Sequence, residues 1–279
     1  MTLAAAVERL TGRKVAGTRP LAGGCVGEVL LVSFTDGCRV VAKRGPGLEP
    51  EAWMLRHLAR HTSLPVPTLV HGEDDLLLME HVKTGGSLDD PAAQAHAAEL
   101  LAGLHEVTWH SFGMERDTVI GCLHQPNPPT ERWLDFWRDN RLLYMAAEAQ
   151  RAGALPIELM RRVERLAGRL HQWIEQPARP SLVHGDAWAG NVLCREGRVA
   201  AFVDPALYYA DPEVELAFGT MFGTFTAPFF RRYEEIAGIR PGFREARCEL
   251  YTLYPLLVHV RLFGGGYVGG VERVLERFE

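Results

Sequence analysis

The feature that most constrains this chain is the segment from His184 to Asn191, HGDAWAGN. Asp186 and Asn191 lie five positions apart, the interval of a recurrent catalytic-loop pattern, H-x-D-x-x-x-x-N. A second acid, Asp204, ends the apolar run AAFVD. An isolated H-G-D tripeptide is more often a simple turn in which the aspartate bonds nearby backbone. The complete segment, followed by an aspartate at a strand end, instead predicts a catalytic loop.

These three side chains have the chemistry that phosphoryl transfer requires. The transferred group carries several negative oxygens, so catalysis depends on positioning and on neutralising charge. One carboxylate must orient the attacking hydroxyl and accept its proton, and we predict that Asp186 is this base. Mg²⁺ prefers oxygen ligands and takes few of them from protein, so we predict that Asn191 and Asp204 bind it. The expected co-substrate is ATP.

A glycine-rich segment near the N-terminus is the first of two upstream signals. Residues 21–30, LAGGCVGEVL, read as a turn between strands. Such a turn lets backbone amides approach phosphates, and Gly23, Gly24 and Cys25 are the predicted nucleotide-binding residues. Taken alone, the segment is more often an ordinary hairpin turn. Cys25 in this position is also expected to be sensitive to oxidation.

The second upstream signal is a lysine followed by a helical acid. Lys43 ends the strand-like run VVAK, and Glu51 lies at the start of the next predicted helix. This arrangement matches the ion pair of kinases in which the lysine contacts the α- and β-phosphates. Glu49 is an alternative partner. A strand-end lysine and a first-turn acid are each common without function, but the order from glycine loop to metal aspartate supports the whole set.

The organisation of the chain indicates two lobes. Two β-rich runs joined across Asp36-Gly37 predict a hairpin, a helix is expected over residues 51–60, and LLLMEHV (76–82) reads as a buried strand. Backbone near Glu80 and Val82 is predicted to bind adenine. After residue 83 the pattern becomes helical, including residues 93–104 and 159–173. We therefore predict an α+β, bilobal protein-kinase-like fold. Residues 1–83 form a nucleotide-binding lobe with an antiparallel sheet and one main helix, and residues 84–279 form a larger, mostly helical catalytic and substrate-binding lobe.

Composition excludes several other classes. The formal net charge of −5 is mixed along the chain, which argues against a nucleic-acid partner. Five scattered cysteines without a C-x-x-C pair argue against a disulfide framework or a structural zinc site. The N-terminal sequence lacks the pattern of a secretory signal, and no uncharged apolar segment is long enough for a membrane span. A cytoplasmic protein without a membrane partner is expected; the composition does not indicate the oligomeric state.

With these residues in place, the chain resembles the fructosamine/ketosamine kinases, which are relatives of aminoglycoside phosphotransferases and choline kinases. HGDAWAGN is similar to the H-G-D-L-W-x-G-N of that family, and the likeness covers almost the whole chain. Further similar blocks are Phe112-Gly113 with Ile120-Gly121 and Gln125-Pro126-Asn127, the helix with Trp133, Phe136, Arg141 and Leu142, and residues 211–217 and 254–266.

The resemblance implies transfer of the ATP γ-phosphate to the 3-hydroxyl of ketosamines, either free or on glycated proteins, and hence a role in deglycation repair. It makes Trp188 a platform for the sugar. His259, on an apolar helix, is a further candidate for the substrate pocket. Three positions depart from the family: Ala187 replaces Leu, Asp117-Thr118 replaces an Asn-rich segment, and Glu215 replaces Asp.

Two rival interpretations remain open from the sequence. One is another small-molecule kinase of the same fold, acting on an aminoglycoside, choline or homoserine. The other is a nucleotide-binding module without catalysis, which the complete set of polar residues disfavours. His57 and His61 have a zinc-compatible spacing but no third ligand, so a solvated helix face is expected. His105 is expected to be a hydrogen-bonded core histidine.

Overall fold

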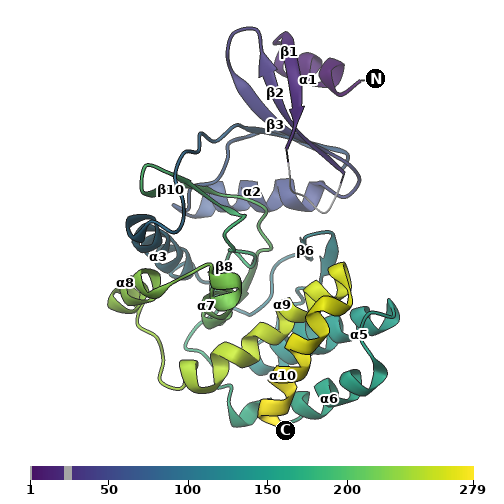
Figure 1. Ribbon diagram of the computed structural model, residues 1–279, viewed down its shortest axis with the longest axis vertical. Helices are drawn as coiled ribbons and strands as arrows, with labels where there is room; N and C mark the ends of the chain where they lie inside the picture. The colour runs from purple at the N-terminus through teal and green to yellow at the C-terminus, as the bar shows by residue number, and fades with distance from the viewer. Residues whose placement is uncertain (1, 22–26) are drawn as a thin grey trace.

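The computed structural model describes residues 2–21 and 27–279. Figure 1 shows a small lobe with a twisted sheet above a larger lobe made mainly of helices. We call them the sheet lobe and the helical lobe. The elements of the sheet lobe are α1 (Leu3–Thr11), β1 (Val15–Pro20), β2 (Glu28–Phe34), β3 (Arg39–Arg44), α2 (Glu49–His61), β4 (Leu69–Gly72) and β5 (Leu76–Glu80).

The sheet is antiparallel, with the strand order β1-β2-β3-β5-β4. The predicted hairpin is present as β2 and β3, and its turn is closed by the Cys38 amide donating to Asp36 Oδ1 at 2.9 Å. Alternate residues of β5 face opposite sides. Leu76 and Leu78 pack with α1, whereas Leu77 packs with α2. Each face of the sheet is therefore covered by one helix.

The predicted helix is α2, and it extends two residues further toward the N-terminus than expected. Pro50 in its first turn needs no hydrogen-bonded amide, and Glu49 and Glu51 favour the positive end of the helix dipole. Burial of its apolar face, in which Leu55 and Leu58 are at most 1% exposed, contributes about 1.5–3 kcal/mol per leucine. This packing holds Glu51 at a fixed place beneath the sheet.

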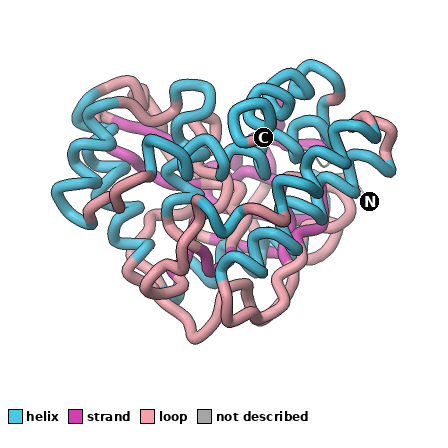
Figure 2. The backbone as a smooth tube through the Cα atoms, turned by 90° about the horizontal axis from the view of Figure 1, so that it is seen from below, coloured by secondary structure: helices cyan, strands magenta, loops and turns pink. Residues whose placement is uncertain are grey.

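The helical lobe combines long helices with short strand pairs, and in the view along the long axis the helices lie around the strands (Figure 2). Its α-helices and strands are α3 (Pro91–His105), β6 (Thr118–Ile120), β7 (Leu123–Gln125), α4 (Trp133–Trp137), α5 (Tyr144–Arg151), α6 (Ile157–Ala167), β8 (Ser181–Val183), β9 (Val192–Arg195), β10 (Arg198–Phe202), β11 (Tyr208–Ala210), α7 (Glu213–Thr220), α8 (Ala227–Ala237), α9 (Cys248–Phe263) and α10 (Val268–Phe278). Short 3₁₀ or π segments are η1 (Arg138–Leu143), η2 (Leu170–Gln172), η3 (Met221–Gly223), η4 (Phe243–Arg247) and η5 (Gly265–Tyr267).

One predicted helix is shorter than expected. The periodic residues 159–173 predicted a single helix, but α6 ends at Ala167, and Leu170 lies in the 3₁₀ turn η2. Gly168 follows the last helical residue, where its low helix propensity favours termination. Leu170 is nevertheless fully buried. The apolar periodicity therefore predicted the burial of this residue correctly, but it predicted a helix that is too long.

The chain passes between the lobes in the segment between Glu80, the last residue of β5, and Pro91, the first residue of α3, and this segment contains no helix or named strand. The amides of Gly85 and Gly86 both donate to the carbonyl of Cys194, which fixes the start of the helical lobe. The domain boundary after residue 83 lies inside this segment and stays a prediction. Among the described residues, no helix has the length and apolar character needed to cross a membrane.

Candidate active site

Two short strand pairs of the helical lobe position the polar side chains predicted from the sequence. The loop 184–191 connects β8 to β9, and Asp204 follows β10. β9 and β10 form a hairpin in which Val192 pairs with Phe202, and the amide of Val203 donates to the carbonyl of Asn191 at 3.0 Å. Asn191 and Asp204 therefore lie side by side at the open end of one hairpin.

The loop itself is fixed by a glycine and by an asparagine. Gly185 has φ = +82°, and a Cβ at this position would lie 2.1 Å from the carbonyl oxygen of Ala206, so only glycine fits. Asn191 Nδ2 donates to the backbone oxygen of Asp186 and to its Oδ2, both at 2.9 Å. Because the amide nitrogen is used in this way, the amide oxygen of Asn191 is left as a possible ligand.

Lys43 joins the sheet lobe to this loop region. Its Nζ lies 2.7 Å from Glu51 Oε1 and 2.5 Å from Asp204 Oδ1. Lys43 is 8% exposed, and although burial lowers the pKa of an ammonium group, the charges of Glu51 and Asp204 raise that of Lys43 above its ordinary value. The alternative partner, Glu49, is instead bound by both terminal nitrogens of Arg116, at 2.9 and 2.7 Å.

Asp186 is held in an environment that disfavours its charge. Burial, together with the nearby charge of Asp204, raises the pKa of Asp186 to about 8, while the hydrogen bond from Asn191 acts in the opposite direction. Once ionised, a carboxylate whose pKa is raised in this way is a stronger base toward a hydroxyl proton than an ordinary aspartate. The structure thus brings together Lys43, Glu51, Asp186, Asn191 and Asp204, which we call the catalytic cluster.

The two residues predicted to contact substrate lie in different settings. Trp188 is 42% exposed, and its indole ring packs against Gly190, where a Cβ would approach the ring to 2.4 Å. His259 is half-buried in α9, where its Nδ1 lies 2.7 Å from the carbonyl oxygen of Pro255. Its ring lies among Phe222, Phe263 and Tyr267 rather than within the catalytic cluster.

The remaining nucleotide-binding predictions fall on two segments. Gly23, Gly24 and Cys25 lie outside the described residues. Glu80 ends β5, and its amide donates to the carbonyl of Thr68 at 2.9 Å. The amide of Val82 donates to no other described residue, and its side chain is partly exposed. Of the predicted pair, Val82 is therefore better suited to offer a backbone donor to a ligand.

Comparison with known proteins assigns the chain to a family. The sequence pattern of the fructosamine kinases matches residues 2–278. The chain belongs to the fructosamine kinase family. A probable ketoamine kinase from Synechocystis sp. is 32% identical over 99% of this chain and 95% of its own length. A chloroplastic protein-ribulosamine 3-kinase from Oryza sativa subsp. indica is 29% identical over 95% of this chain and 79% of its own length.

Solved structures show the same fold. A Thermobifida fusca protein, whose crystal structure is described as that of a fructosamine-3-kinase, superposes with a TM-score of 0.88 at 32% identity and 99% coverage of both chains. The aminoglycoside phosphotransferase APH(4)-Ia, as a thermostable mutant, superposes with a TM-score of 0.70 at 18% identity and 99% coverage of both chains. The predicted protein-kinase-like fold and family resemblance are both confirmed.

Glu215, noted from the sequence only as a departure from the family, supports the catalytic loop from behind. Its two carboxylate oxygens accept the amides of His184 and Gly185 at 3.0 and 2.8 Å. His105, the expected core histidine, lies 3.0 Å from the same carboxylate and 2.7 Å from Tyr233. Burial alone raises the pKa of Glu215, but the hydrogen bond and charge of His105 outweigh it and hold this pKa below its ordinary value.

Two of the blocks noted from the sequence as similar to those of the family form a buried polar network beside β11. Arg141 is fully buried, its guanidinium lies 3.9 Å from the centre of the Tyr208 ring, and it donates to Asn127 Oδ1 at 2.6 Å. Gln125 donates to the carbonyl of Ala206 at 3.1 Å and accepts the hydroxyl of Tyr254 at 2.7 Å. These blocks fix the backbone that follows Asp204, so their role is support rather than contact with the catalytic cluster.

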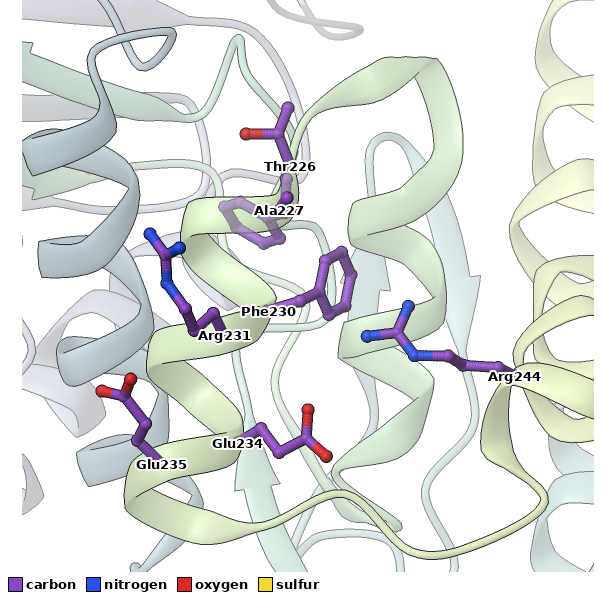
Figure 3. A pocket seen from close by; sticks show the side chains of 8 residues that line it. Thr226, Ala227, Phe230, Arg231, Glu234, Glu235 and Arg244 are labelled. Carbon is purple, nitrogen blue, oxygen red and sulfur yellow. The ribbon is translucent and has the colours of Figure 1, made fainter.

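A pocket of about 550 Å³ lies on another part of the helical lobe (Figure 3). Its lining comes mainly from α8, with Phe230, Arg231 and Glu234, and Arg244 of η4 reaches toward it from the side. None of the predicted site residues belongs to this lining. Because the lining contains no member of the catalytic cluster, we assign no chemistry to this pocket.

Proposed function

We propose that this member of the fructosamine kinase family transfers the γ-phosphate of ATP to the 3-hydroxyl of a ketosamine. The observation that carries the proposal is the convergence of Lys43, Asp186, Asn191 and Asp204 within one cluster of a chain that belongs to the fructosamine kinase family. Relatives named as ketoamine kinases and as a protein-ribulosamine 3-kinase support the substrate class. The product would be a 3-phosphorylated adduct, so the chain would act in deglycation.

The proposed step uses Asp186 as the base. The sugar hydroxyl gives its proton to the Asp186 carboxylate while its oxygen forms a bond to the γ-phosphorus. The bond from that phosphorus to the bridging oxygen breaks, and ADP leaves with the electron pair. Lys43 uses two of its three N–H donors on Glu51 and Asp204, which leaves one for a phosphate oxygen. The exposed face of Trp188 would pack against the sugar.

Residues at the open end of the β9–β10 hairpin fit a magnesium ion. The amide oxygen of Asn191 and the second oxygen of Asp204 are both hard oxygen donors, the type that Mg²⁺ prefers. Among the described residues, no group of three or more His, Cys, Asp or Glu is placed to hold a metal ion. When bound, Mg²⁺ would neutralise charge on the β- and γ-phosphates. Backbone near Val82 would receive the adenine.

A substrate panel tests the proposal. The purified chain is incubated with ATP, Mg²⁺ and one of four acceptors: a ribulosamine, a fructosamine, kanamycin or choline. Phosphorylated product is identified by ³¹P NMR and ADP release is measured in parallel. We expect turnover with one or both ketosamines and none with kanamycin or choline. Asp186→Ala should bind ATP but lose turnover. Preferred turnover of kanamycin or choline would refute the substrate class, and ATP binding without any turnover would refute the catalytic assignment.

A further inference from the structure

A second pocket of the helical lobe, of about 170 Å³, lies between the end of α3, the start of β8, the first turns of α7 and the end of α8. Figure 1 shows these helices grouped on one side of that lobe, and we call the cavity the α7–α8 pocket. Its volume is below that of pockets for drug-sized ligands, so it suits a molecule of a few carbon atoms. Among the described residues, no member of the catalytic cluster lines it. Its charged lining residues are Glu106, Arg179, Asp211, Glu213 and Arg240.

Two further lining residues connect the α7–α8 pocket to the catalytic loop. His105 lines the pocket, and its Nε2 lies 3.0 Å from Glu215 Oε2, the oxygen that also accepts the amide of His184. Tyr233 lines it as well, with its hydroxyl 2.7 Å from His105 Nδ1. His105, Glu215 and Tyr233 are all buried. A molecule in this pocket therefore lies beside the hydrogen bonds that hold the catalytic loop from behind.

Two arginines offer the pocket donors for an anion. Arg179 uses one nitrogen, Nη2, on Glu106, and its other nitrogens donate to no other described residue. Arg240 contacts Asp211 through Nη2 and Glu213 through Nη2 and Nε, which is one edge of its guanidinium, and its side chain is 36% exposed. The planar fork of a guanidinium matches a carboxylate in geometry as well as in charge. The pocket is therefore suited to a ligand that carries carboxylates.

The present partner of Arg179 is easily replaced. The side chains of Arg179 and Glu106 are 48% and 63% exposed, and an ion pair at such exposure contributes little to stability. A carboxylate from solution can therefore take the place of Glu106 on Arg179. Ala178, Leu216 and Ala237 add apolar surface to the lining. This surface favours a ligand with a short carbon chain over a bare inorganic ion, because the chain buries apolar area.

We propose that the α7–α8 pocket binds a small aliphatic dicarboxylate through Arg179 and Arg240, and that the bound ligand slows phosphoryl transfer. The binding is independent of the proposed kinase activity, whereas the slowing rests on it. Arg240 holds the start of α7 through Asp211 and Glu213. A ligand carboxylate on Arg240 competes with these two acids and weakens the attachment of this first turn. Glu215 lies two residues further along α7, so its hold on the catalytic loop weakens as well.

Isothermal titration calorimetry with succinate, at constant ionic strength, tests the binding. The parent should bind succinate but not its uncharged analogue succinamide. Arg179→Met should weaken the binding about tenfold or more, because a charge-assisted contact is lost. Glu106→Gln should tighten it by up to about fivefold, because the competing carboxylate is removed. Arg161→Met, which breaks an exposed pair with Glu158 in α6, should match the parent. Opposite effects of the Arg179 and Glu106 variants would not arise from a surface pair without a ligand.

Initial rates with a ketosamine, ATP and excess Mg²⁺ test the slowing. Saturating succinate should lower the kcat of the parent roughly threefold to tenfold and leave the KM for ATP unchanged. Arg179→Met should match the parent without succinate and resist its effect. A readout without turnover is the ¹H–¹⁵N spectrum: succinate should shift the amide resonances of His184 and Gly185 in the parent but not in Arg179→Met.

Three results would overturn the site: no succinate binding by the parent, unchanged affinity in Arg179→Met, or weaker binding by Glu106→Gln. Succinate that binds as expected but changes neither kcat nor the two amide resonances would overturn its link to the catalytic loop. Failure of the proposed function is distinguishable, because the parent would then turn over no ketosamine. In that case calorimetry still decides the binding, and the resonances of His184 and Gly185 still decide the link.

Discussion

Two groups of ionisable side chains lie in the helical lobe and at its junction with the sheet lobe. They differ in the balance between acidic and basic groups. In the catalytic cluster, the carboxyl groups of Glu51 and Asp204 share Lys43 as their cationic partner, and that of Asp186 is bound only by the neutral amide of Asn191 among the described side chains. The second group lies near the start of α7, where Asp211 and Glu213 meet Arg240 and Arg247. We call this second group the basal cluster.

The basal cluster is balanced and fully hydrogen-bonded. Asp211 is bound by Arg240 and accepts the hydroxyl of Tyr251 at 2.8 Å. Glu213 accepts Arg247 Nε at 2.6 Å and Nη2 at 3.0 Å. Two carboxylates thus face two guanidinium groups, whereas the catalytic cluster has three carboxyl groups and one lysine, an excess of acidic groups. An excess that the protein itself does not neutralise suits a site that receives a metal ion, whereas a balanced set suits a structural role.

If the two clusters differ in this way, the largest change in turnover is expected for Asp186→Asn. Loss of the base should lower turnover of the ketosamine about 10³-fold, the typical contribution of a positioned base. The free energy of unfolding should stay the same or increase, because the change removes a carboxyl group whose charge is disfavoured by burial. Steady-state rates and urea unfolding curves measure the two quantities. If the Asp186→Asn variant lost stability but kept its turnover rate, Asp186 would have a structural role and not a catalytic one.

The opposite behaviour is expected for Arg247→Met in the basal cluster. This change leaves Glu213 buried without its closest cation, which typically costs about 3–5 kcal/mol. Arg244→Met, in the same segment η4 but exposed, should change stability by less than about 0.5 kcal/mol. Urea unfolding measures both. The folded fraction of Arg247→Met should retain its kcat; a selective loss of kcat in folded protein would contradict a purely structural role.

The two clusters also differ in how far the sequence predicts them. Asp186 and Asn191 lie in one loop, Asp204 follows the adjacent hairpin, and Glu51 is eight positions from Lys43, so local patterns identify them all. The contacts of the basal cluster span longer separations, from Asp211 to Arg240 for example, and depend on how α7, α8 and η4 pack together. No local spacing reports such packing.

Contacts between residues far apart in the sequence also explain why the sequence analysis did not predict other contacts near the site. His105 reaches Glu215 across 110 positions, and the signal that was available is weak: three acids at alternate positions in an otherwise apolar segment, DPEVELA. The ring of Phe222 in η3 lies 5.3 Å from that of His259 in α9, and this contact depends on tertiary packing as well. The sequence therefore predicted the fold and the polar residues of the site. The residues that support the site, such as His105 and Glu215, could be identified only from the three-dimensional structure.

Glu215 lies between the two clusters, and its replacement by Gln should have a mixed effect. The neutral amide cannot accept from all the donors that face the carboxylate, so a loss of about 1.5–3 kcal/mol is expected. Displacement of the catalytic loop should lower kcat roughly tenfold to a hundredfold. Glu215→Asp keeps the charge and should lose less. Loss of stability with an unchanged kcat would show that Glu215 does not position the loop.

The stabilising effect of Glu215 should depend on pH. Its pKa in the folded protein lies below the ordinary value, so the ionised carboxylate stabilises the fold above the unfolded pKa of about 4.3. That stabilisation is lost as the pH falls through the folded pKa. Urea unfolding at several acidic pH values should show the difference between the parent and Glu215→Gln shrinking below about pH 4.3. A difference that does not change with pH would contradict this assignment.

The smallest effect is expected at the ion pair between Glu49 and Arg116, which links α2 to the helical lobe. Both side chains are more than a third exposed, so Arg116→Met should cost less than about 1 kcal/mol, and less still at high salt. The pair lies two residues from Glu51, however, and Arg116 also stacks on Trp53 of the same helix. A slight rotation of α2 would weaken the contact of Glu51 with Lys43. We therefore expect the KM for ATP to rise by about twofold to threefold. Arg232→Met breaks a pair of similar exposure with Glu99 and should lower stability equally without changing this KM. Equal KM values in the two variants would mean that the pair between Glu49 and Arg116 has no effect on nucleotide binding. The orientation of Glu51 would then be set by the apolar face of α2 alone.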